Sequence, residues 1–310
     1  MANHYQEFHR AELNKGTKED PVTLEELPTI AQNGRQTIGY LRCVNRCPLL
    51  IVHYSTDSAH QLFVSRNYPK EPETNSLLNP GFTERIKLYH KAVTTLSPEQ
   101  LALSLKQKTP ELEAAVTRQK KALFWKYLNG TCTFAEKLIL RISLFIDDTD
   151  VLQVYDRTQA TAELQQANDR NWLIRQSSIR DTDIIKIRAI SFKKAFEQGI
   201  GHVIIVQIYG YGFMISPNFP TNQSLNLPGE PQDRVVATMG SQIPLPTGAV
   251  YPSFIDALDK CCLDFDLNKL GLIGSLELSQ TALALEAGAI EARAIEARAI
   301  EARAVDAAAP

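Results

Sequence analysis

Two hydrophobic periods alternate along the chain, one typical of helices and one typical of strands. In the stretch 94–149, four apolar residues follow one another at spacings of four, four and three, which predicts a helix with one apolar face. Ser97 and Thr109 each precede a proline and a glutamate, a pattern typical of the start of a helix. We therefore predict a helical spacer or packing bundle here. The apolar stripe consists of Phe134, Leu138, Ile142 and Phe145.

From residue 150 the pattern changes to short runs rich in β-branched residues. The run 203–206 is β-branched throughout, which favours a buried strand over a helix. The segment 216–251 is rich in Pro, Gly, Asn and Gln, and a loop of that length is usually functional or disordered. Strands are predicted over 172–176, 184–191, 202–209 and 212–215, with helices over 158–167 and 252–262.

The two ends of the chain have patterns of their own. Residues 1–93 mix apolar runs with turn signals such as Asn33-Gly34, which indicates a small α+β unit ending in a helix over 83–93. Three copies of Ala-Ile-Glu-Ala-Arg fill 289–303, and on a helix this five-residue period rotates by about 140° per repeat, so no apolar stripe forms. We expect an α+β protein with four segments. They are a small domain at 1–93, the helical spacer at 94–149, a sheet domain at 150–272 and a solvated tail at 273–310.

Composition narrows the function classes. The chain has 310 residues, 44% hydrophobic and 22% charged, which excludes a wholly disordered protein. The net charge of −2 argues against a nucleic-acid partner, although it allows a local basic pocket. No run is long enough to span a membrane, and the N-terminus lacks the apolar core of a signal peptide. Five cysteines without a disulfide pattern favour a reducing, cytoplasmic compartment.

The segment 171–178 carries the chemistry. In a strand, Trp172 and Ile174 face one side while Leu173 and Arg175 face the other. An arginine in such apolar surroundings is at least half buried and needs a partner, because an unpaired buried charge is costly. The partner is either an internal Asp or Glu, which would make the protein a purely structural interaction module, or the anionic group of a ligand.

Neighbouring residues favour the ligand. Ser177 and Ser178 offer hydroxyl and backbone N–H donors in a turn directly after the arginine, and such a turn is a natural phosphate nest. Lys186 and Arg188 are two apart on the next strand and therefore share a face. Arg157 stands at the start of the preceding helix, and arginine suits phosphate because its planar fork donates two parallel bonds.

At this point the sequence resembles an SH2 domain, the phosphotyrosine-binding module. The resemblance implies that Arg175 holds the phosphate from the pocket floor, with Ser177 and the turn after it as further donors. It also implies that Arg157 flanks the phosphate and that His202 packs on the phenol ring. The matching segments are 157–160 for the first helix, 172–177 for the arginine strand, 202–215 for the histidine strand and following turn, and 254–258 for the second helix.

Two positions depart from the SH2 pattern. Ile204 stands where the family usually has a cation, so Lys186 or Arg188 would replace it. The loop 216–251 is far longer than in most members and looks like the insert of bacterial SH2 domains delivered into host cells. That likeness implies a host-cell location and tight, weakly sequence-selective capture of tyrosine-phosphorylated proteins.

The N-terminal unit resembles a U-box, the metal-free relative of the RING ubiquitin-ligase module. The matching segments are Asp20 to Leu27, Tyr68 to Pro80 and Glu84 to Ile86, whereas the middle of the unit departs from the family. The likeness implies that Val22 and Pro69 or Pro72 contact a ubiquitin-conjugating enzyme. It leaves two functions open, a phosphotyrosine-binding protein or a ubiquitin ligase with the SH2-like part as its substrate receptor.

No catalytic, metal or cofactor site is predicted. The sequence carries no Ser-His-Asp arrangement, P-loop, HExxH or dinucleotide signature. A zinc site from Cys43, Cys47, His53 and His60 would have an unusual spacing, with an apolar run between its ligands. For the N-terminal unit as a whole, the alternative to a U-box is a structural domain whose Pro-rich turns join strands.

Overall fold

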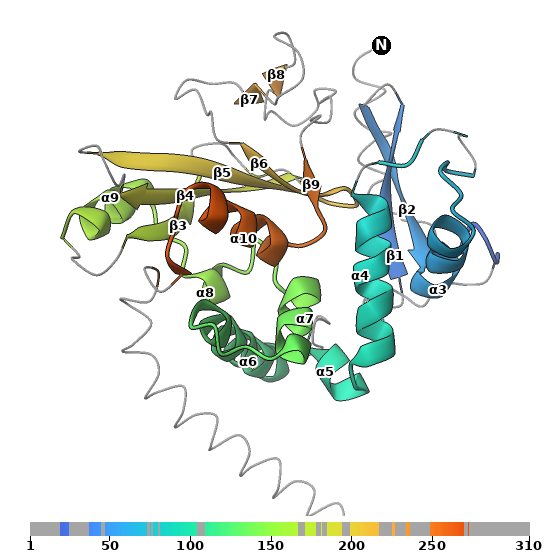
Figure 1. Cartoon of the computed structure of the whole chain (residues 1–310), viewed down its shortest axis with the longest axis horizontal. Helices are drawn as coiled ribbons and strands as arrows, with labels where there is room; N and C mark the ends of the chain where they lie inside the picture. The colour runs from blue at the N-terminus through green and yellow to red at the C-terminus, as the bar shows by residue number, and fades with distance from the viewer. Residues whose placement is uncertain are drawn as a thin grey trace, which may run out of the picture.

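The computed structural model contains both helices and strands, and its largest sheet is antiparallel and five-stranded (Figure 1). None of the helices it describes is both long and apolar enough to cross a membrane. The described residues are 19–24, 37–44, 47–72, 75, 77–79, 81–103, 109–166, 171–177, 181, 185–193, 199–216, 225–226, 234–235, 249–269 and 272. The repeat tail and most of the segment 217–248 lie outside them.

The five-stranded sheet occupies the C-terminal half, as its β-branched runs predict. Its strand order is β3-β4-β5-β6-β9, and every neighbouring pair is antiparallel. The first strand has the predicted bounds. The second begins one residue later and ends two residues later than predicted, and the third begins two residues earlier and ends one residue earlier. The strands are β3 (Trp172–Gln176), β4 (Ile185–Lys193), β5 (Ile200–Ile208), β6 (Gly212–Ser216) and β9 (Val250–Tyr251).

The strand register divides the sheet into two faces. Residues that pair across neighbouring strands share a face, so Trp172 and Ile174 lie on one side with Ile190 and Val203. We call this side the α10 face, because it packs on helix α10 (Phe254–Asp264) through residues such as Phe254 and Leu258. The opposite side, here the Arg175 face, carries Arg175, Ala189, Ser191, His202 and Ile204.

The predicted helical stretch packs directly on the α10 side of the sheet. One hydrophobic core contains Phe124 and Leu140 together with Trp172, Ile205 and Phe254. The sheet therefore shares its core with helices that the sequence analysis assigned to a spacer. These are α6 (Pro110–Leu128), α7 (Phe134–Ser143) and α8 (Thr149–Leu152), while the short α5 (Pro98–Ala102) precedes them. Thr109 and Thr133 cap α6 and α7 with their hydroxyls.

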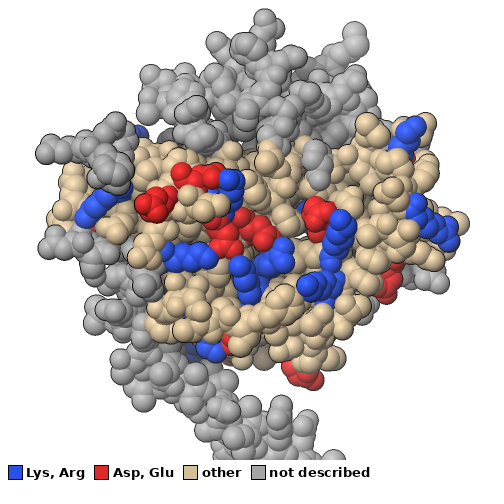
Figure 2. Space-filling model, in the orientation of Figure 1, with Lys and Arg blue, Asp and Glu red and all other residues tan. Residues whose placement is uncertain are grey.

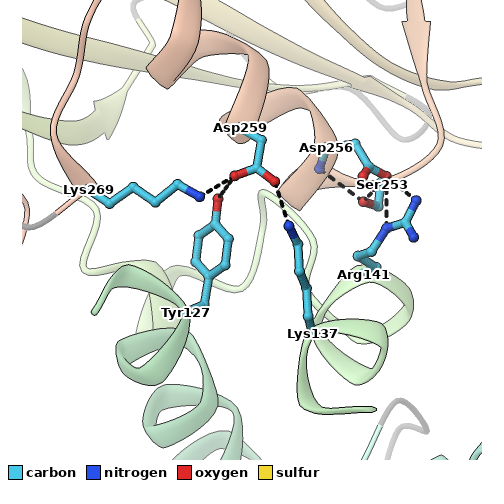
Figure 3. A network of polar contacts seen from close by, with 7 residues as sticks. All are labelled: Tyr127, Lys137, Arg141, Ser253, Asp256, Asp259 and Lys269. Carbon is cyan, nitrogen blue, oxygen red and sulfur yellow. Dashed lines mark hydrogen bonds and ion pairs between the residues drawn. The ribbon is translucent and has the colours of Figure 1, made fainter. Parts of the chain in front are cut away.

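Polar contacts join the same helices to α10 (Figure 3). The Tyr127 hydroxyl donates to Asp259 over 2.6 Å, and Lys137 approaches the same carboxylate at 2.9 Å. Lys269 also donates to Asp259, and burial raises the pKa of Tyr127 well above its usual value. A second group joins Arg141 to Asp256, which also accepts from Ser253. Figure 2 shows the resulting pattern, in which acidic and basic side chains intermix on this face instead of forming a patch of one sign.

The N-terminal part builds a hairpin that reaches the other side of the sheet. Leu41 and Ile51 pack with Ile187, Ile204 and Val206, so the hairpin covers the apolar portion of the Arg175 face. The Leu41 N–H also donates to the Gly210 carbonyl over 2.9 Å. The elements are β1 (Thr37–Val44), β2 (Cys47–Ser55), α3 (Thr56–Ala59), the π-helix η1 (His60–Ser65) and α4 (Phe82–Thr95).

Candidate anion-binding site

The backbone of Arg175 is held on both sides of its strand. β4 pairs with one edge of β3, and Tyr155 forms a parallel bridge with Arg175 on the other. The Tyr155 N–H donates to the Ile174 carbonyl over 3.0 Å, and the Gln176 N–H donates back to Tyr155 over 2.8 Å. The strand thus fixes the origin of the arginine side chain, which is a condition for a preorganised binding site.

The Arg175 guanidinium is buried, and its partners among the described residues are neutral. Its Nε donates to the Ser191 hydroxyl over 2.9 Å, and its Nη1 donates to the Gln176 carbonyl over 2.8 Å. No carboxylate of the described residues lies within ion-pair distance of it, and Nη2 has no hydrogen-bond partner among them. The internal ion pair that a structural role would require is therefore missing from this part of the chain.

Two more polar side chains extend the site along the Arg175 face. Ser191 is 1% exposed, and its hydroxyl lies 2.9 Å from the Nδ1 atom of His202, directly across from it on β5. Arg157, the first residue of α9 (Arg157–Gln166), is exposed, and α9 packs on β3 and β4. Its positive charge is close enough to act on both Arg175 and His202.

The pKa values of Arg175 and His202 are lowered by burial and by neighbouring positive charge. Burial lowers the pKa of Arg175, and the nearby Arg157 lowers it further. Burial also lowers the pKa of His202, with Arg175 and then Arg157 adding to the effect. Among the described residues, no acidic group offsets these effects at Arg175 or His202. An anion placed here would relieve the repulsion, so the arrangement suits a negatively charged ligand.

The structure does not bring Lys186 and Arg188 into this cluster. They share a face, but pairing with Gln207 and Ile205 places that face opposite Arg175. Arg188 is instead neutralised by Asp181, whose carboxylate oxygens lie 3.0 and 3.2 Å from its Nη1. The expectation that either residue replaces the cation missing at Ile204 is corrected by this register, and Ile204 itself is buried under the hairpin.

The serines that follow β3 are described only in part. Ser177 is half-buried directly after the strand, two residues beyond Arg175. Ser178 and the rest of the expected phosphate-binding turn lie outside the described residues, apart from Asp181. The expected role of both serines as donors therefore stays a prediction.

A second surface lies on two loops of the N-terminal part. Asp20 accepts from the Ser55 N–H over 2.6 Å and from the Ser58 hydroxyl, which fixes the first loop to the start of α3. Glu71 is fully buried and accepts from the Tyr54 hydroxyl over 3.1 Å, which fixes the second loop to the end of β2. The two loops are thus anchored at consecutive residues, Tyr54 and Ser55. Val22, Pro69 and Pro72 are all exposed on them.

These loops concentrate exposed apolar side chains. Leu24 and Leu77 are 74% and 73% exposed, and Val22 and Tyr68, on the same two loops, are 39% and 40% exposed. Large apolar groups on rigidly anchored loops are typical of a protein-docking surface. No group of three or more potential metal ligands occurs in the described part of the chain. The side chains of Cys43 and Cys47 lie outside it.

Sequence reasoning missed Ser191 and the anchoring roles of Asp20 and Glu71, although both acidic residues lie in the segments that resemble a U-box. Ser191 is a lone hydroxyl between Ile190 and Phe192 in an apolar strand, and that isolation is a signal that could have been noticed. Its contacts with Arg175 and His202 depend on strand register, which the sequence does not give. Comparison with known protein families, with characterised proteins and with solved structures finds no match to the chain.

Proposed function

We propose that the protein binds phosphotyrosine-containing segments of other proteins through an SH2-like site centred on Arg175. The observation that carries the proposal is the buried Arg175 guanidinium, which has neither an acidic partner nor a hydrogen-bond acceptor for Nη2 among the described residues. A buried cation without a counter-charge costs free energy, and a phosphate dianion would supply the missing charge.

The surroundings of Arg175 support a phosphate ligand. Arg157 adds a second guanidinium, and guanidinium groups bind phosphate through paired, charge-assisted hydrogen bonds. His202 presents an exposed imidazole beside the cations, in a position to contact the ring that carries the phosphate. The element order, α9 then β3 to β6 then α10 with the arginine on the first strand, is the one that the SH2 resemblance implies.

The same resemblance extends the proposal to the biological setting. The protein would act as a bacterial effector that captures tyrosine-phosphorylated host proteins in the host cytoplasm, tightly and with weak sequence selectivity. The long loop that the resemblance links to this mode of binding falls mainly in 217–248, almost wholly outside the described residues.

The decisive test is a calorimetric titration of the full chain with one peptide in three forms, carrying phosphotyrosine, phosphoserine or neither. The full chain is required because α6 and α7 complete the core of the sheet. We expect a Kd below about 1 µM for the phosphotyrosine form and no binding of the other two forms. Equal binding of the phosphoserine form would replace the proposal with a general phosphate site, and no binding of any form would overturn it.

A matched pair of variants tests the site itself. Arg175 and Arg188 are both 8% exposed and lie on the same sheet, but Arg188 has its own carboxylate. Arg175→Lys keeps the charge and loses the fork, so we expect affinity to fall by a factor of about 100 or more. Arg188→Lys should leave affinity within a factor of about 3, because this residue faces the opposite side. Similar losses in both variants would contradict the assignment.

We propose ubiquitin-ligase activity as a second candidate function, carried by the loops anchored at Asp20 and Glu71. Their exposed apolar residues support it, since a conjugating enzyme would dock on such a surface. It is compatible with phosphotyrosine capture, which would then select the substrate.

The ligase proposal is tested by ubiquitin discharge from a charged conjugating enzyme. Val22→Ala should reduce the stimulation by a factor of about 10 and leave peptide binding unchanged, because docking surfaces depend on a few apolar anchors. Leu112→Ala is the matched control, since Leu112 is exposed on α6, away from both loops in the sequence. Absence of stimulation by the unaltered chain with a panel of conjugating enzymes would rule this function out.

A further inference from the structure

The Ser191 hydroxyl lies between two groups with opposite hydrogen-bonding needs. On one side, Arg175 Nε donates to it over 2.9 Å, and on the other, His202 Nδ1 lies 2.9 Å away. Ser191 is 1% exposed, so these contacts are protected from competition with bulk water. The three side chains form one chain of hydrogen bonds across β3, β4 and β5.

The donors and acceptors of this chain allow two arrangements. A hydroxyl donates one hydrogen bond and accepts up to two, and arginine Nε always donates. When His202 Nδ1 carries no proton, the Ser191 hydroxyl donates to it. When Nδ1 carries a proton, Ser191 accepts from both Arg175 and His202, and its own proton is released to another acceptor.

We infer that Ser191 and His202 form a proton-coupled switch, in which phosphate binding protonates His202 and turns the Ser191 hydroxyl towards the ligand. The inference rests on the proposed phosphate site and adds a regulated donor to it. Ser191 acts here as a positioning residue that also becomes a ligand donor, and His202 acts as the proton acceptor.

The charges around His202 give the direction of the coupling. The described charged groups on its side are Arg175 from β3, Arg157 from α9, and Lys193, which shares its face on β4 two residues beyond Ser191. Burial and the two arginines lower the pKa of His202, which favours the neutral ring without ligand. A phosphate dianion on Arg175 would cancel that positive field and attract a proton, so the pKa of His202 rises on binding.

Linkage then fixes how affinity depends on pH. A group whose pKa is higher in the complex takes up a proton on binding, so affinity falls as pH rises through the interval between the two pKa values. The phosphate itself loses its second charge below about pH 6, which limits the effect at the acidic end. A rise of about one unit in the pKa of His202 corresponds to a tenfold loss of affinity across the interval.

The experiment is an NMR titration of the imidazole protons of the full chain, with and without saturating O-phosphotyrosine, from about pH 5.5 to about pH 8.5. The signal of His202 is assigned from its absence in His202→Gln. We expect the ligand to raise the pKa of His202 by about one unit or more. Ser191→Ala should reduce that rise by at least half, because the acceptor of the Nδ1 proton is lost.

Two variants control the measurement. Ser143→Ala removes another fully buried serine hydroxyl, far from the site in sequence and on α7, and should leave the rise unchanged. His202 is exposed, so we expect His202→Gln to fold normally. The affinity of this variant should depend on pH only as far as the ionisation of the ligand requires. If the ligand binds and the pKa of His202 does not move, the switch is overturned and the phosphate site stands. If O-phosphotyrosine does not bind at any pH, the proposed function itself is overturned.

Discussion

The two faces of the five-stranded sheet each bury one arginine, and they treat it differently. On the α10 face, Arg188 pairs with Asp181 at 3.0 Å. On the other face, Arg175 bonds to the Ser191 hydroxyl and a carbonyl, and within the described part of the chain the charge that acts on it is the like charge of Arg157. Both residues are equally buried, so burial alone does not separate an internally paired arginine from one without a counter-charge among the described residues.

The comparison teaches that the presence or absence of an internal counter-charge distinguishes the two buried arginines. An internally paired arginine gains its counter-charge when the protein folds. Removing that arginine leaves the partner carboxylate without a counter-charge. An arginine surrounded by neutral donors and acceptors holds its charge at a cost to stability, and only an external anion recovers that cost. Four changes to the protein break or sharpen this contrast, and they are given from the largest expected effect to the smallest.

Removing the counter-charge of Arg188 has the largest expected effect. Asp181→Ala leaves the guanidinium buried without its carboxylate and removes the acceptor of the Ile187 N–H. We expect the free energy of unfolding to fall by about 3 kcal/mol, measured by urea denaturation of the full chain. A loss below about 1 kcal/mol would mean that this ion pair is worth no more than an exposed one.

The hairpin that covers the Arg175 face is tested by two glycines with the same backbone conformation. Gly210 and Gly130 have φ values of +72° and +70°, but a Cβ atom on Gly210 would lie 2.8 Å from the Leu41 nitrogen, whereas Gly130 has open space. We expect Gly210→Ala to lower the free energy of unfolding by about 2 kcal/mol more than Gly130→Ala. Equal losses of stability in the two variants would show that the hairpin can move to accommodate the added Cβ atom without a free-energy cost.

The buried His53 sharpens the contrast between the core and the candidate site. His53 is buried in β2, and burial lowers its pKa below 6.5. The unfolded chain therefore binds more protons below about pH 6.5, and stability falls as pH falls through that value, by at most about 1.4 kcal/mol per pH unit.

The measurement is urea denaturation at two pH values, about 7.5 and about 5.5. His53→Gln should show a smaller loss of stability on acidification than the unaltered protein, and O-phosphotyrosine should not change that difference, because His53 is not part of the proposed binding site. An identical loss in both proteins would show that His53 does not contribute to acid sensitivity.

The smallest effect is expected at Arg175 itself. Arg175→Met removes a desolvated charge together with two hydrogen bonds, so the free energy of unfolding without ligand should change by no more than about 1 kcal/mol. Arg188→Met is the matched control and should lower the free energy of unfolding by more, because it leaves the Asp181 carboxylate without a counter-charge. A loss above about 3 kcal/mol for Arg175→Met in denaturation would make Arg175 a structural residue.

Much of the sheet could be predicted from the sequence, because local patterns determine strands and caps. The bounds of β3 follow from its apolar run, and the opposite orientation of Ile174 and Arg175 follows from the period of two in a strand. The starts of α5 and α6 follow from the proline and hydroxyl signals at Ser97 and Thr109.

The composition of the site could not be predicted in the same way. The sequence correctly places Lys186 and Arg188 on one face of β4, but only the pairing with β3 decides that this face is opposite Arg175. A shift by one residue would exchange the faces and remove Ser191 from the site. The hairpin over Ile204 and the shared core of α6 and α7 are contacts between distant segments, and no local pattern specifies them.

The sequence by itself determined that this protein has a buried arginine in an apolar strand, with donors nearby, and that this arginine needs a partner. Short-range sterics and the alternation of side chains are sufficient for that conclusion. Only the tertiary structure decided which residues surround the arginine, because strand register and packing depend on free energies summed over the whole core. The contrast between Arg175 and Arg188 belongs to that second level, since each is an arginine in an apolar strand and only their neighbours differ.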